Sequence, residues 1–588
     1  MRPRLTFGLL AAGLSVGAAR GDEHDWPSYN RDPAGWRFNA AEKSIGSENA
    51  GRLEEKWRFP ARGSNFEIGV IHATPVVVGG AAYFGTASDP NFYKVGPDGK
   101  LLWSYRNPGH SKPAAPAANG KTDPNAKKLR FQSSGDGILG SALVEGDAVY
   151  FGDIGGWFYA LDAATGKERW KVHARSTKFP GTHPYNMFFA SPIFADGKVI
   201  VGGGTLEQVI GALPFYRKST GRGFVIAFDA KTGKIAWKHD VGPKPAPLDP
   251  PVVIKADWGE QTFVYGPATS SIWCTPSFDP ESGTVYFGTD VNTAPRRPTK
   301  EDPRLYTEDS CAIRAIDVKT GALKWNVQIN PDDVWNNAMR SYDAKTGRYK
   351  DQSIGDTPKI FRITVDGSPR KVVGAGCKNG GFYVLDAADG KMISQTPIYT
   401  GKPQFPLAPA PDPRMLALPS LIGGLQTGCA TDGRTIFVNG IDALQLGSAG
   451  NPIDIVNPPS GGRVTAVSVD LATERWRHER PKLASMGGTK EKPLYREVGD
   501  PVASGIAVAN GVVYFTTVAS GKLVAADAAT GKALKEFEIG PVWSGPSVSR
   551  GRVYVGTGNT LFNDYEFEAY FPKKGTGELI CYGLPESN

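Results

Sequence analysis

The sequence has 588 residues and a formal net charge of +8, with 72 glycines, 46 prolines and 11% aromatic residues. The basic excess is spread without basic runs, which argues against a nucleic-acid partner, and after residue 20 no stretch is apolar enough to span a bilayer. Frequent glycine and proline are typical of many short strands joined by turns, so we expect an all-β protein with little helix.

The N-terminal residues have the pattern of a secretory signal peptide. Two arginines precede an apolar run, residues 5–19, which ends in small residues before charge resumes. We therefore expect residues 1–20 to be removed and residues 21–588 to form a single domain. No cysteine precedes Cys274, so the cleavage point lacks the thiol that lipid attachment requires. These features predict a periplasmic or secreted protein.

The rest of the chain is organised around a repeated pattern, whose clearest copy is FYALDAATGKERW, residues 158–170. Altered copies are FYKVGPDGKLLW ending at Trp103, FVIAFDAKTGKIAW (224–237), AIRAIDVKTGALKW (312–325), FYVLDAADGKMIS (382–394), VTAVSVDLATERW (464–476) and LVAADAATGKALK (523–535). Apolar residues alternate, a turn follows, and a second strand begins. The Asp162 side chain can accept backbone N–H groups two residues on, and Gly166 can adopt the positive φ that closes the turn. The pattern predicts β-hairpins.

A hairpin repeated this often cannot bury its apolar face alone, so neighbouring copies must stack, and the Trp that ends most copies is placed to wedge between them. The final strand, Glu578–Leu584, is not followed by the second strand of a repeat, and the strand that contains Trp57 is not preceded by a first strand. Joining them would add an eighth unit and close a ring. We therefore predict an eight-bladed β-propeller of four-stranded antiparallel blades, closed by N- and C-terminal strands.

The copies lie further apart than the roughly 40–50 residues that a four-stranded blade needs, so long loops must fill the difference. The longest candidates are residues 107–132, 174–189, 243–269, 294–309, 334–358, 397–421 and 481–500. Loops gathered on one face would roof a site at the top of the central channel.

Cysteine and histidine offer no recognisable metal or haem site. The five cysteines are odd in number, so at least one is unpaired within a monomer, and one or two disulfides are compatible with an oxidising compartment. The sequence has no C-x-x-C-H motif for covalently bound haem and no C-x-x-C pair for zinc, and its seven histidines show no metal-binding spacing.

Residues 26–558 resemble a family, the exported quinoproteins that carry pyrroloquinoline quinone (PQQ) in an eight-bladed propeller, such as methanol and polyvinyl alcohol dehydrogenases. The segments GGLQTGCATDGRTIFVNG (423–440) and ASGIAVANGVVYF (503–515) are similar to the polyvinyl alcohol dehydrogenase branch. The turn repeats alone are less specific, because propellers that are not enzymes share them. The resemblance therefore depends on the positions that would form the site.

Three segments match the family's cofactor site. The match implies that Trp273, in IWCTPSFDP, lies under the planar quinone, where a large aromatic face suits stacking. It implies that Lys378, in GCKNGG, contacts the reactive carbonyl oxygens and stabilises negative charge there. It implies that Glu207, after a run of glycines, binds calcium, which would act as a Lewis acid. The alternatives are a core tryptophan, an exposed turn lysine and a solvated glutamate.

The metal and base positions depart from the family. The slot of the family's Asn ligand falls on Val291, which cannot bind a metal, so Asp290 or Asn292 would have to replace it. The slot of the catalytic Asp of methanol-oxidising members falls on Asn336, and an amide cannot accept the alcohol proton at neutral pH. Asp333 is the nearest carboxylate that could serve, with Asp332 behind it.

Other family features are also altered. The vicinal cysteine pair of methanol dehydrogenases is missing. A position that is often Glu in alcohol-oxidising members is His72, and a Trp expected in a G-G-x-x-W-G motif is replaced by Thr427. The cofactor cradle is partly kept, whereas the metal and base positions are partly lost.

Two functional hypotheses follow. The first is an exported PQQ-dependent dehydrogenase that oxidises an alcohol or polyol, binds calcium and passes electrons to a separate acceptor such as a cytochrome c, since no haem motif is present. The second is a non-catalytic propeller that acts as a binding or assembly module. Quinone binding and dye reduction would distinguish them.

Overall fold

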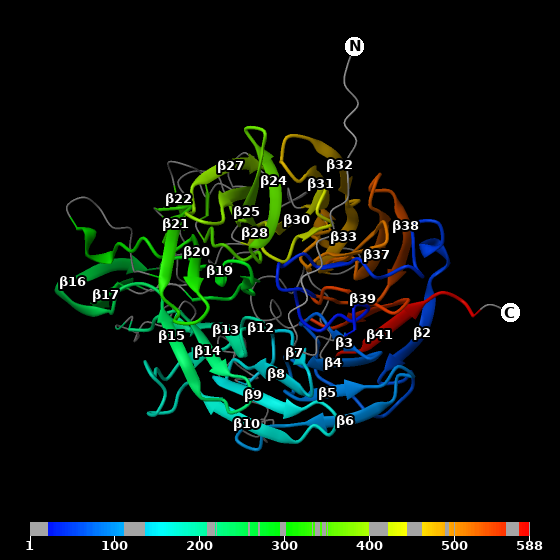
Figure 1. Cartoon of the computed structure of the whole chain (residues 1–588), viewed down its shortest axis with the longest axis horizontal. Coiled ribbons are helices and arrows are strands. Elements are labelled where there is room, and N and C mark those ends of the chain that lie inside the picture. Colours follow the sequence, from blue (N-terminus) through cyan, green and yellow to red (C-terminus); the bar gives the residue numbers. More distant parts are fainter. Residues whose placement is uncertain are drawn as a thin grey trace, which may run out of the picture.

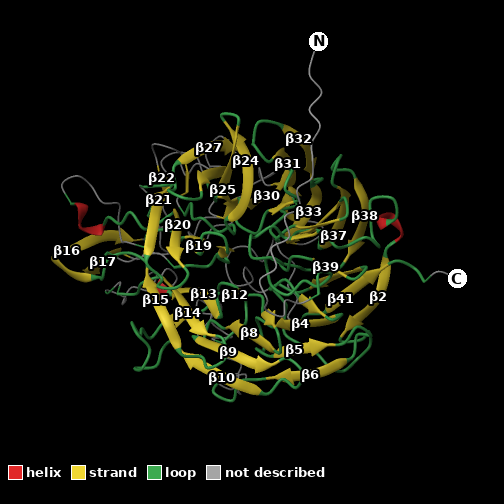
Figure 2. Ribbon diagram, viewed as in Figure 1, coloured by secondary structure: helices red, strands yellow, loops and turns green. Residues whose placement is uncertain are grey.

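The computed structural model is a ring of small β-sheets around a central axis, viewed along that axis in Figure 1, and its regular structure is almost entirely strand (Figure 2). The structure describes residues 22–110, 136–207, 218, 220–256, 259–267, 271–293, 302–331, 333–334, 342–343, 348–349, 351–398, 422–443, 461–488, 493–498, 500–559 and 576–586. The sheets follow one another round the ring in chain order, from blue to red. The predicted all-β propeller is confirmed.

Eight antiparallel sheets form the blades, which we number in chain order, with the first strand of each nearest the axis. Blades 1 to 4 are β3–β6 (Val76–Val78, Ala81–Gly85, Phe92–Val95, Leu101–Tyr105), β7–β10 (Leu143–Glu145, Ala148–Gly152, Trp157–Asp162, Glu168–His173), β12–β15 (Ile193–Ala195, Lys198–Thr205, Phe224–Asp229, Ile235–Asp240) and β18–β21 (Ser277–Asp279, Thr284–Gly288, Ala312–Asp317, Leu323–Gln328). Blades 5 to 8 are β24–β27 (Lys359–Val365, Ser368–Gly376, Gly381–Asp386, Met392–Pro397), β29–β32 (Ala430–Thr431, Thr435–Ala443, Gly461–Ser468, Glu474–Glu479), β35–β38 (Ala507–Ala509, Val512–Thr517, Lys522–Asp527, Ala533–Glu538) and β39–β41 (Ser547–Ser549, Arg552–Gly556, Leu579–Gly583) with β2 (Glu54–Phe59). Short strands β1 (Phe38–Asn39), β11 (Asn186–Met187) and β28 (Ile422–Gly424) extend blades 7, 3 and 6.

The repeated turns join the third and fourth strands of the blades. In blade 2, the N–H of Thr165 donates to Oδ1 of Asp162 at 2.8 Å, and Gly166 closes the turn with a φ of 71°. This is the turn that the sequence predicts, because Asp caps the exposed N–H groups and glycine adopts positive φ without steric cost.

The Trp that ends a repeat packs on the turn of the next blade. Nε1 of Trp170 donates to the carbonyl of Ala230 at 3.1 Å, and a Cβ added to Gly233 would lie 2.6 Å from Cδ2 of the Trp170 ring. The same Trp–Gly contact recurs in the pairs Trp57–Gly99, Trp103–Gly166, Trp237–Gly321, Trp325–Gly390 and Trp476–Gly531. Glycine is therefore needed at these turns for its conformation and for the space that the indole occupies.

Both ends of the chain build the eighth blade. Strand β41 pairs with β40 on one side and with β2 on the other, with Trp57 opposite Cys581. The predicted closure of the ring is confirmed, and because β2 is the outer strand of that blade, the ring has no open seam between its first and last units.

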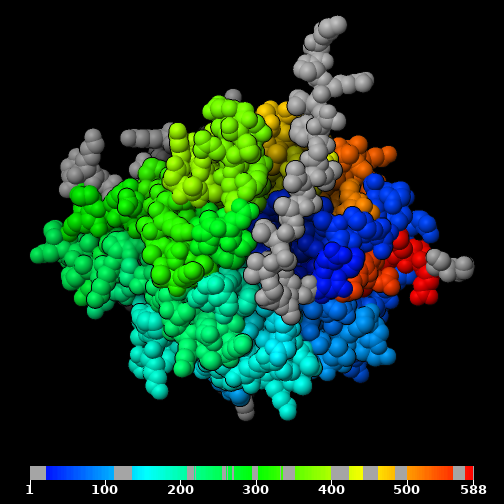
Figure 3. Space-filling model, viewed as in Figure 1, coloured from blue at the N-terminus to red at the C-terminus, as the bar shows by residue number. Residues whose placement is uncertain are grey.

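Residues 26–39, which we call the channel segment, run along the inner strands of the ring. Main-chain hydrogen bonds join the segment to six blades, through the pairs Trp26–Val77, Pro27–Val144, Pro33–Phe278, Ala34–Ile360, Trp36–Thr431 and Arg37–Val508. In Figure 3 this dark-blue surface lies near the centre of the ring. Beyond the segment, Glu42 accepts the N–H of Gly551, in the turn between the first and second strands of blade 8, at 2.8 Å. The channel segment therefore lies against the first strands of six blades.

One cation of the channel segment is fully buried. Nε of Arg37 donates to the carbonyl of Ile506 at 2.6 Å, a second nitrogen donates to the carbonyl of Tyr29, and the guanidinium lies 4.3 Å from the centre of the Tyr29 ring. Burial lowers the pKa of Arg37 from its usual value. Arg37 thus ties the segment to blade 7 through main-chain carbonyls.

Further elements lie outside the blades. Hairpins are formed by β16 (Ala246–Ala256) with β17 (Gly259–Gly266), β22 (Tyr342–Asp343) with β23 (Arg348–Tyr349), and β33 (Leu483–Gly488) with β34 (Pro493–Val498), and short 3₁₀ helices by η1 (Ala50–Arg52) and η3 (Pro303–Leu305). The β16–β17 hairpin projects from the rim between blades 3 and 4 (Figure 1). The described ranges contain no helix that could cross a membrane. All five cysteines are buried and free, so neither of the disulfides considered from the sequence is formed.

Candidate functional site

Three of the residues singled out from the sequence occupy equivalent positions in consecutive blades. Glu207, Asp290 and Lys378 each lie two residues after the second strand of blades 3, 4 and 5, which are β13, β19 and β25. Trp273 precedes the first strand of blade 4, and Asp333 follows its last strand. All five therefore lie at the end of the ring opposite the repeated Asp–Gly turns.

Hydrogen bonds join blade 3 to blade 4 at this end. The N–H of Thr205 donates to the hydroxyl of Ser271 at 3.2 Å, and the carbonyl of Ser271 accepts the N–H of Asp290 at 3.0 Å. Ser271 is two residues before Trp273. The loop that carries this Trp therefore links the end of β13, near Glu207, to the start of the loop at Asp290.

Lys378 is held by a carboxylate that the sequence reasoning missed. Its Nζ lies 2.6 Å from Oδ2 of Asp351, both residues are buried, and its N–H donates to the carbonyl of Ser353 at 3.0 Å. Gly424 packs on Lys378 so closely that an added Cβ would lie 2.1 Å from the Lys378 carbonyl oxygen. Lys378 is therefore fixed from two sides, with its ammonium directed at Asp351.

Asp351 has unusual backbone geometry. Its φ is 102°, in the left-handed region that a non-glycine residue occupies only when its surroundings impose it. The residue begins the sequence DQSIGDTPKIF, which leads into β24. An acid before a strand is an ordinary pattern, and only the positive φ brings this one to Lys378, so the sequence carried little signal.

Trp273 packs against the loop that carries Asp351. A Cβ added to Gly355 would lie 2.0 Å from Cη2 of the indole, so the edge of the ring rests on this glycine. The flanking residues Ile272 and Cys274 are each 1% exposed, whereas Trp273 keeps an accessible surface. Trp273 and Lys378 therefore contact the same short loop, residues 351–355.

A second buried carboxyl reaches Asp351 through one hydroxyl. Ser353 Oγ lies 2.6 Å from Oδ1 of Asp290 and 2.9 Å from Oδ1 of Asp351. Burial, and then the charge of Asp351, raises the pKa of Asp290 to about 7. Because a serine hydroxyl carries one proton, both contacts are hydrogen bonds only when one carboxyl is protonated, and Asp290 is the acid whose pKa permits it near neutrality.

Asp333 is buried, and both of its carboxylate oxygens accept hydrogen bonds. Its Oδ1 accepts the N–H of Asp351 at 3.1 Å, and its Oδ2 accepts the N–H of Gln352 and the thiol of Cys311 at 3.3 Å. Burial is the main cause that raises its pKa, and the charge of Asp351 adds to it. Asn336 and Asp332 lie outside the described residues.

Each predicted calcium ligand has partners within the protein. Glu207 accepts the N–H groups of Thr220 at 2.8 Å and Gly221 at 2.6 Å, and the amide of Asn292 donates to the carbonyl of Leu305 at 2.9 Å. Within the part of the chain that is described, no three His, Cys, Asp or Glu side chains gather to hold a metal ion. Calcium binding therefore stays a prediction, and we assign the ion no chemical step.

The structure describes two of the positions that differ from the family, His72 and Thr427. His72 is buried, and burial lowers its pKa to about 3, so the imidazole is neutral at physiological pH. Thr427 donates to the carbonyl of Ala503 at 3.0 Å and accepts from the amide of Asn439. Both contacts of Thr427 are within the protein.

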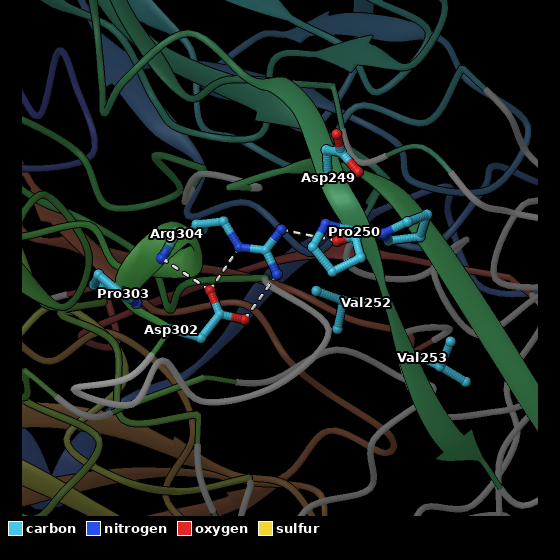
Figure 4. A pocket seen from close by; sticks show the side chains of 8 residues that line it. Asp249, Pro250, Val252, Val253, Asp302, Pro303 and Arg304 are labelled. Atoms are coloured by element: carbon cyan, nitrogen blue, oxygen red, sulfur yellow. Dashed lines mark hydrogen bonds and ion pairs between the residues drawn. The ribbon is translucent and has the colours of Figure 1, made fainter.

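A separate hollow of about 550 Å³ lies at the base of the β16–β17 hairpin. Figure 4 shows Asp302 in a bidentate ion pair with Arg304. Arg304 also donates to the carbonyl of Pro250 at 2.8 Å. These groups satisfy one another and pin the hairpin to η3, which suits a structural contact.

A protein-family comparison decides the relationship. The model described as "Glucose/ethanol/alcohol dehydrogenase, beta-propeller domain" matches residues 26–399, well over half of the chain, and the model of the outer membrane protein assembly factor BamB matches residues 460–576. The chain belongs to the PQQ-dependent alcohol dehydrogenase family.

Curated members of the family match much of this chain. It is 31% identical over 398 residues to quinohemoprotein alcohol dehydrogenase ADH IIB of Pseudomonas putida, which covers 66% of the chain and 49% of the relative. It is 26% identical over 420 residues to a polyvinylalcohol dehydrogenase of a Pseudomonas species, covering 70% of the chain and 58% of the relative. The matched part thus spans about half the length of these relatives.

Solved structures support the fold. Quinohemoprotein alcohol dehydrogenase from Comamonas testosteroni aligns with a TM-score of 0.66 at 21% identity, covering 96% of the chain described here and 82% of that relative. A europium-containing methanol dehydrogenase aligns with a TM-score of 0.63 at 18% identity, covering 96% and 98%. The arrangement of the blades is therefore shared across the family.

Proposed function

We propose that this quinoprotein is an exported PQQ-dependent dehydrogenase that oxidises an alcohol or polyol and passes the electrons to a separate acceptor such as a cytochrome c. The observation that carries the proposal is the buried contact between Lys378 and Asp351, on the same loop whose Gly355 supports the half-buried Trp273. It brings together a cation, a base and an aromatic surface at one end of the ring. The named relatives are alcohol dehydrogenases, which supports the same class of substrate.

The residues present fit the quinone. The half-buried Trp273 would support a flat ring system, and Lys378 would hold the carbonyl side by charge and hydrogen bonding. When bound, PQQ supplies the carbonyl group that accepts a hydride or its equivalent. The chain would contribute the orientation of the cofactor and the handling of the substrate proton.

We assign the base to Asp351. An ion pair with Lys378 requires an ionised carboxylate, which is the form that can accept a hydroxyl proton. Oδ1 of Asp351 lies 2.9 Å from the Ser353 hydroxyl, which links this carboxylate to the second buried acid, Asp290. Asp333, which the sequence suggested for this role, directs both oxygens at main-chain N–H groups.

We also propose that the protein is exported and that it binds calcium. The pattern of residues 1–20 supports cleavage and a periplasmic or secreted location. Calcium binding is to be tested by leaving CaCl₂ out of the assay, because the described His, Cys, Asp and Glu side chains form no group of three that could hold the ion.

The test is reconstitution of the purified protein with PQQ, with and without CaCl₂. We expect the absorbance of bound quinone and reduction of an artificial electron acceptor with short alcohols or polyols. Trp273→Ala should weaken binding of the quinone, and Asp351→Asn should keep binding but lose turnover. Failure of the folded wild-type protein to bind PQQ would instead favour a non-catalytic module, the alternative supported by the BamB match over residues 460–576.

A further inference from the structure

We propose that Asp333 is a positioning residue, which holds Asp351 in its strained backbone conformation and thereby directs the Asp351 carboxylate at Lys378. The inference rests on the proposed function, since it concerns the base of that reaction. It assigns to Asp333 a different role from the one that the sequence suggested.

The carboxylate of Asp333 forms a two-point anchor for the main chain. Its oxygens accept the consecutive N–H groups of Asp351, at 3.1 Å, and Gln352, at 2.5 Å. These N–H groups belong to the two peptides on either side of the Cα of Asp351, so one carboxylate that accepts both restricts the φ and ψ of that residue. The hydrogen bonds are strong because the acceptor can be ionised.

Asp351 needs such an anchor. A non-glycine residue at a φ of 102° is destabilised relative to an ordinary conformation, so contacts from its surroundings must offset that strain. The Asp351 side chain contributes through Lys378, at 2.6 Å, and Ser353, at 2.9 Å. These contacts form only when the main chain already has this conformation, whereas the hydrogen bonds from Asp333 act on the main chain itself.

Contacts of Cys311 and of the neighbouring Val334 hold Asp333 in place. The Cys311 thiol donates to its Oδ2 at 3.3 Å, and Val334, the next residue, forms a parallel bridge with Asn292. Val334 also belongs to an apolar cluster with residues of the β16–β17 hairpin and η3, namely Leu248, Val252, Phe263 and Leu305. The anchor is therefore rigid, and its oxygens point at the main chain instead of at an accessible surface.

The inference is tested with Asp333→Asn and Asp333→Ala in the full chain. Asparagine keeps one oxygen that can accept an N–H, and alanine keeps none. A positioning role predicts a graded loss of kcat, roughly tenfold for Asn and roughly 100-fold or more for Ala, with KM and the PQQ dissociation constant within about threefold of wild type. A general base predicts that Asn and Ala are equally inactive, because neither accepts a proton, and this result would overturn the inference.

A second measurement needs neither PQQ nor substrate. Hydrogen exchange of a peptide that covers residues 351–356 should be faster in Asp333→Ala than in wild type by at least about tenfold, because the anchored N–H groups lose their acceptor. The matched control is Asp500→Asn, since Asp500 is also buried and accepts the N–H of Ser520 at 2.9 Å in another loop. The control should leave exchange in residues 351–356 unchanged.

The outcomes separate the two proposals. Unchanged exchange in Asp333→Ala overturns the positioning role whatever the activity of the protein. Faster exchange in Asp333→Ala, together with a wild-type protein that binds no PQQ, supports the anchor and overturns the dehydrogenase proposal.

Discussion

The two ends of the ring are built in different ways. At the end with the repeated turns, the same Trp–Gly contact occurs in six pairs of neighbouring units. At the opposite end, three equivalent positions carry Glu207, Asp290 and Lys378, and each has different partners. Repetition suits a contact that only has to hold blades together, whereas a site needs different groups that meet once.

Two buried cations, one in the channel segment and one in the candidate site, show a similar contrast. Arg37, in the channel segment, is satisfied by main-chain carbonyls and the Tyr29 ring. Lys378 is satisfied by the carboxylate of Asp351. Carbonyls hold a cation without offering a group that can accept a proton, so Arg37 suits a structural role and Lys378 suits chemistry.

The sharpest test of this contrast is Asp351→Asn. We expect kcat to fall by roughly 10²–10⁴-fold, the usual contribution of a general base, while the absorbance of bound quinone persists. The matched control is Asp386→Asn, in the repeated turn of the same blade, where the carboxylate accepts the N–H of Ala388 at 2.9 Å. This control should change kcat less than about twofold, because Asp386 lies in a turn at the opposite end of the ring. Equal losses in both variants would contradict the division between the two ends.

Lys378→Met removes the cation and keeps most of the side-chain volume. The PQQ dissociation constant should rise by roughly 10–100-fold, the value of a hydrogen bond to a charged group, as measured by titration of quinone absorbance. Lys391→Met, in the turn of the same blade, is the control and should bind like wild type. Unaltered binding in Lys378→Met would remove Lys378 from the cradle.

At the turn end, Gly233→Ala should cost roughly 1–3 kcal/mol of unfolding free energy in denaturant titration, because the new Cβ would overlap the Trp170 ring. Gly197→Ala is the matched control, since Gly197 has a φ of 73°, close to the 70° of Gly233, but nothing lies within 4 Å of its added Cβ. The difference between the variants measures the packing contribution. Equal losses would mean that the Trp–Gly contact adds nothing beyond the turn conformation.

The smallest expected effect is that of Asn292→Ala. Loss of the hydrogen bond to the Leu305 carbonyl should lower the unfolding free energy by roughly 0.5–1.5 kcal/mol. Because that amide serves a structural contact, the concentration of CaCl₂ that gives half-maximal activity, if any is required, should match wild type. A shift of that midpoint would restore Asn292 as a calcium ligand.

The contrast also explains what could be predicted from the sequence. The hairpin turns, the Trp wedge and the eighth blade depend on local rules, such as Asp162 capping a turn that Gly166 closes, and these rules repeat often enough to be recognised. Lys378 and Trp273 were found only through a resemblance to a family. Local patterns can therefore reveal a scaffold more readily than a site.

Asp351 shows why the site was harder to predict from the sequence than the scaffold. Its proximity to Lys378 depends on a positive φ, which no side-chain preference of aspartate predicts, and on an anchor from Asp333, 18 residues earlier. The sequence places Asp333 close to a family position but does not show that its oxygens turn toward the main chain. The base and the residue that orients it are distinguished by backbone geometry.

The closure of blade 8 has a consequence for how the chain matures. Strand β2 finds its partner β41 only after more than five hundred further residues have been made, as the pairing of Phe59 with Leu579 shows. Until then the first strand has an unpaired edge, and contacts this distant in sequence make folding slow. A chain truncated before β41 would leave that edge exposed, so we expect such truncations to aggregate instead of forming a smaller ring.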